Sequence, residues 1–126
     1  MSGTVTAFPV AIMGYGRTLY FLTFYPNGSS AVSNASNKGV GWTVARTSQG
    51  LFTITMRDSM AQIDGAIPSP QLASVAARKL QIGIISVSAK TIQVRSIDDS
   101  AAVQDIAADA NNSISMLVCV RHGAEL

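Results

Sequence analysis

The alternation of apolar and polar positions predicts β-strands through most of the chain after Gly50. Between residues 51 and 56, Phe52, Ile54 and Met56 alternate with Leu51 and two threonines. Such a period of two is typical of a strand with one buried face. Other segments share this alternation or are rich in β-branched residues, and we expect strands at 42–47, 51–58, 80–87, 91–97 and 113–121.

The strand predicted at residues 17–25 is apolar on both faces. Leu19 and Phe21 lie on one face, whereas Tyr20, Leu22 and Phe24 lie on the other. A strand with one wet face would alternate apolar with polar residues. This strand is therefore either sandwiched inside the domain or meets another subunit with one face. Before it, residues 4–13 are strand-like but contain Pro9, which favours an edge strand or an extended arm.

The remaining segments read as connections. Pro26-Asn27-Gly28 predicts a turn, and the Ser/Asn/Gly-rich stretch after it predicts a long surface loop over 26–41. Residues 60–74 contain Pro68 and Pro70, so we expect an irregular crossing between sheets. The Ala- and Asp-rich segment 98–112 fits either a short helix or an ordered loop.

Together these elements predict an all-β fold, a β-sandwich or jelly roll of about seven strands. A length of 126 residues fits a single domain over residues 1–126, with 1–13 as arm or edge strand and 26–41 as the surface loop.

Charge is sparse along the chain. Charged residues make up 13% of the sequence, about half of the roughly 25% that is usual in soluble domains. Coverage of the surface by other subunits would explain the deficit, and so would a surface rich in Ser, Thr and Asn. The net charge is +2 and the basic residues are scattered, so we expect no nucleic-acid partner.

No secretion or membrane signal is visible. The start has no basic residues followed by an apolar stretch, and apolar runs such as Leu19–Leu22 are far shorter than a membrane span. We therefore expect synthesis in a cytoplasm and no membrane partner. Cys119 has no second cysteine to pair with and lies in an alternating apolar run, which predicts a buried, unreactive thiol.

Candidate catalytic patterns fail on their spacing. Arg121-His122-Gly123 matches the nucleophile tripeptide of histidine phosphatases, but no second histidine is present. One His and one Cys cannot hold zinc. The acidic residues of 98–112 do not have the spacing of an EF-hand loop, so solvated or capping carboxylates are the stronger interpretation. We expect no catalytic residue, no metal and no cofactor, and hence a protein that is not an enzyme.

The second half of the chain resembles small structural proteins of tailed bacteriophages. A Gly-led strand ends in an Asp at 50–58, a Gln-x-Gly strand follows at 80–83, and a Lys-Thr-led return strand spans 90–95. An Asp-x-Ala-x-x-x-Asn-Asn loop then lies within 103–112, and the last strand at 115–121 ends in Arg. The order of these elements, over roughly residues 50–121, carries the resemblance.

This resemblance implies a β-sandwich virion component, such as a capsid decoration or cement protein on the outside of a phage head. Its expected partners are the major capsid protein and other copies of itself, as a dimer or trimer. The arm around Pro9 and the two-faced strand would carry the contacts, and 26–41 would be a projecting or subunit-clasping loop. The aromatic-rich first half supplies the interface candidates: Phe8, Pro9, Tyr15, Tyr20, Leu22, Phe24 and Trp42. The alternative function is a tail, baseplate or fibre module that binds host glycans, with Trp42 in its ring platform.

Overall fold

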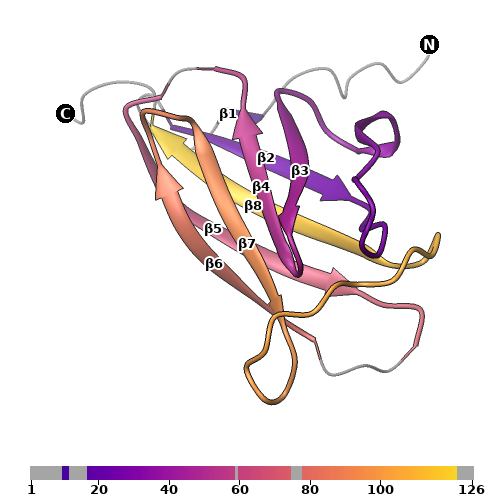
Figure 1. Cartoon of the computed structure of the whole chain (residues 1–126). Coiled ribbons are helices and arrows are strands. Elements are labelled where there is room, and N and C mark those ends of the chain that lie inside the picture. The colour runs from indigo at the N-terminus through magenta and orange to yellow at the C-terminus, as the bar shows by residue number, and fades with distance from the viewer. Residues whose placement is uncertain (1–9, 12–16, 59, 75–77, 122–126) are drawn as a thin grey trace, which may run out of the picture.

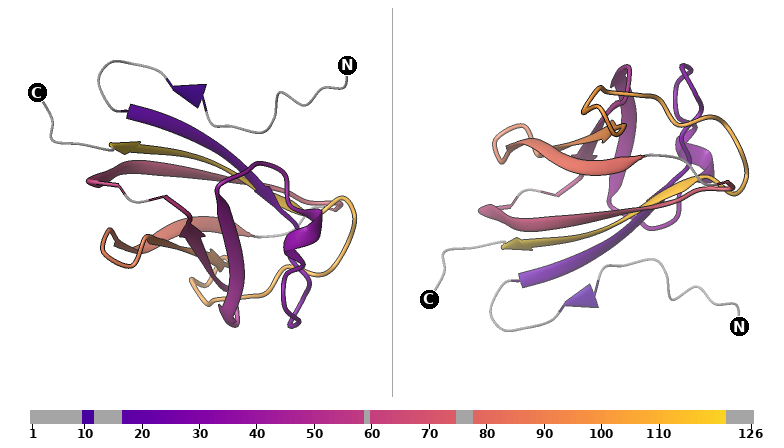
Figure 2. Two further views of the ribbon diagram at one scale, coloured as in Figure 1. Left: turned by 90° about the horizontal axis from the view of Figure 1, so that it is seen from above. Right: turned by 90° about the horizontal axis from the view of Figure 1, so that it is seen from below.

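The computed structural model describes residues 10–11, 17–58, 60–74 and 78–121, and these form a sandwich of two antiparallel sheets (Figures 1 and 2). The first sheet has the order β1-β2-β8-β5 and the second has the order β3-β4-β7-β6. Their bounds are β1 Val10–Ala11, β2 Arg17–Phe24, β3 Trp42–Ser48, β4 Leu51–Met56, β5 Gln62–Gln71, β6 Lys79–Ser86, β7 Thr91–Ile97 and β8 Ser113–Arg121. The predicted all-β sandwich is confirmed.

Four of the strands that were predicted from the sequence form two hairpins, which supply the second sheet. β3 pairs with β4, and β6 pairs with β7, while β4 and β7 lie side by side in the middle. The first sheet is assembled differently, because its central strand β8 comes from the end of the chain and lies between β2 and β5. This crossover ties the beginning of the described chain to its end.

The core lies between the two sheets and is almost wholly apolar. β2 contributes Tyr20, Leu22 and Phe24, which are all buried, and the facing strand β4 contributes Phe52 and Ile54. The rings of Phe24 and Phe52 have centroids 5.2 Å apart, and Trp42 meets Phe24 edge-on at 6.4 Å. Such pairs add favourable ring contacts to the burial of their area. The face of β2 that carries Tyr20 is therefore the one that the fold buries.

The expected irregular crossing over 60–74 is wrong, because β5 is a strand of ten residues that includes Pro68 and Pro70. The physical reason is its place in the sheet. Among the described strands, β5 pairs with β8 alone and lies at the edge of the sheet. A strand at an edge tolerates proline where the missing N–H faces away from its partner.

The 26–41 loop closes one side of the sandwich. It contains a short 3₁₀ helix at Asn34–Ser36, and Lys38 exchanges two backbone hydrogen bonds with Thr23 of β2. The 98–112 segment is an ordered loop of turns and extended residues. Its Ile106 is buried in the core, and the carboxylate of Asp105 accepts hydrogen bonds from Arg46 and from the N–H of Gly50.

Candidate interaction surface

The outer face of the first sheet carries a row of apolar side chains across three strands. The register aligns Phe21 of β2 with Leu117 of β8, and Leu117 with Ile67 of β5. Because alternate residues of a strand point to opposite faces, burial of Tyr20 and Leu22 turns Phe21 outward. Phe21 is 60% exposed and Ile67 is 66% exposed, so two large apolar side chains meet solvent on either side of Leu117.

The neighbouring rows differ from the central one: one contains Leu19 with two small residues, and the other contains hydroxyl-bearing residues. On one side, Leu19 pairs with Cys119 and Cys119 with Gly65. The predicted burial of Cys119 is wrong, since its place in β8 turns it to the outer face, where it is half-buried. The cause is the alternation of side chains along β8: Val118 and Val120 point into the core, so Cys119 between them points outward.

Hydroxyl groups lie on the other side of the apolar row. Thr23 pairs with Ser115, and their hydroxyl oxygens are 2.9 Å apart and hydrogen-bonded. Ser115 pairs in turn with Ser69 of β5. These hydroxyls form a polar end of the outer face, where Lys38 of the 26–41 loop pairs with Thr23.

A linked group of charged side chains lies at the opposite end of this face. Arg17 donates to one oxygen of Asp64 at 3.2 Å, Arg121 donates to the other at 2.9 Å, and Arg121 also donates to the side-chain oxygen of Gln62. Burial alone would raise the pKa of Asp64, but the hydrogen bonds and charges of the two arginines outweigh it and hold the pKa below its usual value. Asp64 therefore stays ionised and fixes the two guanidinium groups.

The outer face of the second sheet has a different character. Its register aligns Thr43 with Thr55 and Thr55 with Thr91, and Thr53 pairs with Gln93. Hydroxyl and amide side chains suit a face that meets water. The two outer faces of one small sandwich thus differ in their central strands: β4 and its neighbours carry threonines, whereas β2, β8 and β5 carry an apolar row. The edge strand β6 of the second sheet also has two exposed isoleucines, Ile84 and Ile85.

All four of the predicted interface residues that the structure describes lie in the core. Tyr20, Leu22, Phe24 and Trp42 are all buried, so they pack the sandwich and do not present contact side chains. Phe8, Pro9 and Tyr15 lie outside the described residues, and so does His122 of the Arg-His-Gly tripeptide.

Sequence reasoning did not select Phe21, Leu117 and Ile67. The apolar character of both faces of 17–25 was a signal for Phe21, but it did not say which face is outward. Ile67 lies in the segment that was expected to be irregular, so its side chain could not be assigned to a face of a sheet. Only the pairing of three distant segments brings these side chains into one row.

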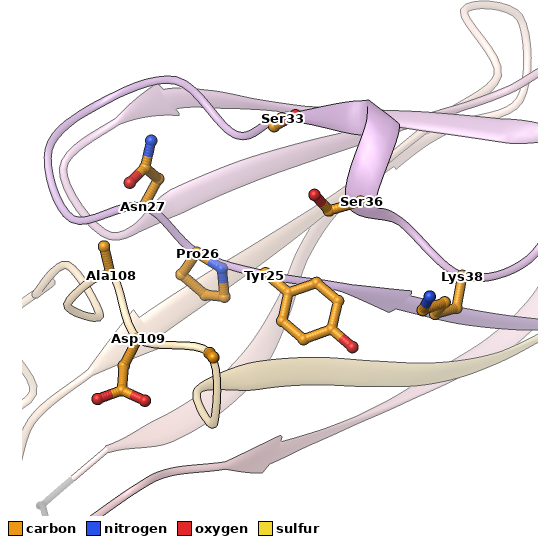
Figure 3. Close-up of a pocket in the computed structure, with 9 residues that line it drawn as sticks. Tyr25, Pro26, Asn27, Ser33, Ser36, Lys38, Ala108 and Asp109 are labelled. Carbon is orange, nitrogen blue, oxygen red and sulfur yellow. The ribbon is translucent and has the colours of Figure 1, made fainter.

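A pocket of about 540 Å³ lies at the end of the sandwich beside the 26–41 loop (Figure 3). Figure 3 shows the Tyr25 ring in its wall between Lys38 and Asp109. The amide of Asn27 and the hydroxyls of Ser33 and Ser36 add polar groups to a lining that also contains Pro26, Ala108 and Ala110. A ring flanked by amide, hydroxyl and charged groups is suited to a small polar ligand.

Three of the four carboxylates of the 98–112 loop, those of Asp98, Asp105 and Asp109, accept hydrogen bonds from protein donors. Asp98 accepts from the N–H groups of Ser100 and Ala102 and from the side chain of Gln104. These hydrogen bonds, led by the N–H of Ala102, lower the pKa of Asp98. Asp109 accepts from the N–H of Asn111. Among residues 10–11, 17–58, 60–74 and 78–121, no three His, Cys, Asp or Glu side chains come together as a metal site.

No family model, no curated protein and no solved structure matches this chain. In the described part of the chain, no helix is long and apolar enough to cross a membrane.

Proposed function

We propose that this chain is a non-enzymatic structural protein of a virion, of the capsid decoration type, that stabilises the junctions of major capsid subunits on the outside of a phage head. Its work is binding: apolar surface is covered by protein when the particle assembles, and the free energy of that burial strengthens the assembly. At this location the major capsid protein is its partner.

The observation that carries this proposal is the apolar row of Phe21, Leu117 and Ile67. Scattered exposed apolar residues are normal on a soluble protein. A row that crosses three paired strands is different, because its members are neighbours and form one patch. The threonine-rich face of the other sheet gives the contrast within the same domain. A surface of this kind supports a function in which another protein binds to the patch and covers it.

The resemblance to phage structural proteins supports the same function. The segments that carry it include β4 and β7, the two central strands of the second sheet, and β8, a central strand of the first. These strands form the scaffold, whereas Phe21 comes from the first half of the chain. On this proposal, the second half of the chain supplies the scaffold and the first half adds part of the contact surface.

Binding to particles tests this function directly. Capsids of the virus that encodes the chain, assembled without it, are incubated with the purified protein, sedimented and tested for resistance to heat. We expect saturable binding and capsids that withstand a higher temperature. Capsids that neither bind the protein nor gain stability would contradict the proposal.

A second candidate function is glycan recognition by a tail or fibre module, and the pocket at Tyr25 favours it. A sugar ring can stack on an aromatic side chain while its hydroxyls bond amide and carboxylate groups. Trp42 cannot serve as this platform, because it is buried and packs edge-on against Phe24. If the chain binds glycans, the ring that does so in the described pocket is Tyr25.

A glycan array separates the two candidates. Glycan binding by the wild type that is lost in Tyr25→Ala and kept in Phe21→Ala would support the second function, since Phe21 is an exposed ring on the outer face of the first sheet and is not part of the pocket. An array without binding, together with binding to capsids, would support the first.

A further inference from the structure

We infer that the pocket at Tyr25 binds a sugar ring that carries a carboxylate group, with Lys38 paired to the carboxylate and Asp109 accepting hydrogen bonds from the sugar hydroxyls. This inference rests on glycan recognition, the second candidate function, and goes further by naming the chemical class of the glycan. It does not depend on binding to capsids. Three features of the pocket favour an acidic saccharide.

The first feature is the hydrogen-bonding capacity that the fold leaves open in the pocket. Among the described residues, none forms an ion pair with the Lys38 ammonium group. The hydroxyl of Ser33 does not cap the 3₁₀ helix that follows it. Asp109 uses Oδ1 to accept from the N–H of Asn111 at 2.8 Å, which leaves Oδ2 to a ligand. Asp105, by contrast, uses both oxygens on protein donors.

The second feature is the separation of two opposite charges by an aromatic ring. Figure 3 shows Tyr25 between Lys38 and Asp109, and these two described side chains do not pair with each other. A ligand that stacks on the ring thus meets a cation on one side and an acceptor on the other. The C–H face of a sugar suits the ring and the apolar wall of Pro26 and Ala108.

The balance of charged and neutral groups separates an acidic sugar from other small ligands. A neutral sugar would give Lys38 only neutral acceptors, and such hydrogen bonds are about half as strong as those to a carboxylate. A small zwitterion would match both charges but would not use the hydroxyls of Ser33 and Ser36 or the side-chain oxygen of Asn27. A sugar with a carboxylate uses both kinds of group, and the volume of about 540 Å³ is ordinary for a ligand site.

The third feature is that the walls of the pocket are held in place without a ligand. Both backbone groups of Lys38 bond to Thr23 of β2, at 2.8 and 3.0 Å. The N–H of Gly28 donates to the carbonyl oxygen of Ile106 at 3.0 Å, which ties the 26–41 loop to the 98–112 loop. These two loops supply most of the lining. A site whose walls are already fixed loses less conformational freedom on binding.

The test is calorimetric binding of oligosaccharides that contain a uronic acid or a sialic acid, each beside a counterpart in which the carboxylates are reduced to hydroxymethyl groups. We expect a carboxylated saccharide to bind the purified protein roughly tenfold or more tightly than its counterpart. This preference should shrink at high salt, because Lys38 is exposed and its charge is screened. Equal affinities, or no binding of any carboxylated saccharide, would overturn the inference.

Lys38→Gln should remove most of the preference for the carboxylate and leave the affinity for the reduced counterpart close to that of the wild type. Because Lys38 is exposed, this variant should fold. Lys79→Gln is the matched control, since it removes the same charge from an exposed lysine of β6 that does not line the pocket. It should bind like the wild type. An equal loss in the two variants would mean that net charge, and not the pocket, attracts the saccharide.

Asp109→Asn should weaken the binding of the carboxylated and the reduced saccharide by a similar factor, because the hydroxyls that donate to Asp109 are common to both. Asp99→Asn removes an exposed carboxylate from the same loop, outside the pocket lining, and should bind like the wild type. Tighter binding of the carboxylated saccharide by Asp109→Asn would show that Asp109 repels the ligand, and it would overturn the assigned arrangement.

This inference and the proposed functions fail in different ways. Neutral saccharides that bind as tightly as carboxylated ones would keep the second candidate function and overturn the inference. A protein that binds capsids and no saccharide would keep the decoration function and overturn the inference. A protein that binds acidic saccharides through Lys38 and ignores capsids would support the inference and contradict the decoration function.

Discussion

The side-chain amide of Asn34 bonds both backbone groups of Val44, the third residue of the edge strand β3. Its nitrogen donates to the carbonyl oxygen of Val44 at 3.1 Å, and its oxygen accepts from the N–H of Val44 at 2.9 Å. A neighbouring strand would satisfy the same two groups. The 26–41 loop thus covers part of an edge that could otherwise pair with another chain.

Asn34→Ala should lower the free energy of unfolding by about 1–2 kcal/mol, because two partly buried hydrogen bonds are lost. Chemical denaturation measures the change. Asn111→Ala, at an exposed position of the 98–112 loop, is the matched control and should change it by less than about 0.5 kcal/mol. Equal stability of the two variants would show that the amide does not hold the edge.

Because of Asp105, the free energy of unfolding should fall as the pH is lowered in the acid range. The hydrogen bonds from Arg46 hold the pKa of Asp105 below its ordinary value, and the N–H of Gly50 adds to this effect. A carboxyl with a lowered pKa in the folded state stabilises the fold at pH values above its unfolded pKa. This contribution is lost as the pH falls through the folded pKa.

We therefore expect Asp105→Asn to be less stable than the wild type by about 1–2 kcal/mol at neutral pH, since hydrogen bonds to a charged group are lost. The difference should shrink below about pH 4. Denaturation curves across this range measure it. Asp99→Asn removes an exposed carboxylate from the same loop and should track the wild type. A difference between wild type and Asp105→Asn that is independent of pH would contradict the assigned role.

Two glycines with the same backbone conformation should respond differently to alanine. Gly50 has φ of 66° and Gly28 has φ of 60°, both in the region that favours glycine. A Cβ at Gly50 would lie 2.7 Å from the backbone nitrogen of Gln104 and 2.9 Å from the carbonyl oxygen of Ser96, whereas a Cβ at Gly28 would meet nothing within 4 Å.

Gly28→Ala should therefore cost about 1 kcal/mol, the strain of the left-handed conformation alone. Gly50→Ala should cost about 3 kcal/mol or more, because backbone atoms must also move. Thermal or chemical unfolding of the pair tests this difference. Equal costs would mean that the 98–112 loop can shift away from the turn between β3 and β4 at little cost.

The sequence predicted the strands whose patterns depend only on local alternation. β4, β7 and β8 have a clear period of two, and the bounds of β8, Ser113–Arg121, are the predicted ones. β5 was missed because Pro68 and Pro70 are poor strand formers by local rules. Their tolerance depends on the position of β5 at an edge, which is a property of the whole sheet.

The candidate surface was predictable only in part, because local patterns gave the composition of β2 but not the face that points outward. The composition of 17–25 indicated that an outward face could be apolar, but the core and the outer face of β2 could not be told apart. That choice depends on which face meets Phe52 and the other core residues of the second sheet. The apolar row needs, in addition, the register of β2 and β5 on β8, and residues so far apart in sequence leave no local signal of it.

Pro68 and Pro70 should protect the free edge of β5. Alternate residues of an antiparallel strand direct their backbone groups to the same side, so two prolines at this spacing can both remove donors from the edge that has no partner. An edge with fewer donors is a poorer template for pairing with another chain. Their presence in a ten-residue edge strand thus has a physical use.

The double variant Pro68→Thr, Pro70→Thr restores two donors and introduces residues with high strand propensity. We expect faster concentration-dependent association of the purified protein, measured by light scattering, with little change in the free energy of unfolding. Gln71→Thr raises the strand propensity of the same strand without adding a backbone donor and should associate like the wild type. If both variants associate equally fast, strand propensity accounts for the effect; if the double variant associates no faster than the wild type, the edge is protected by something other than its prolines.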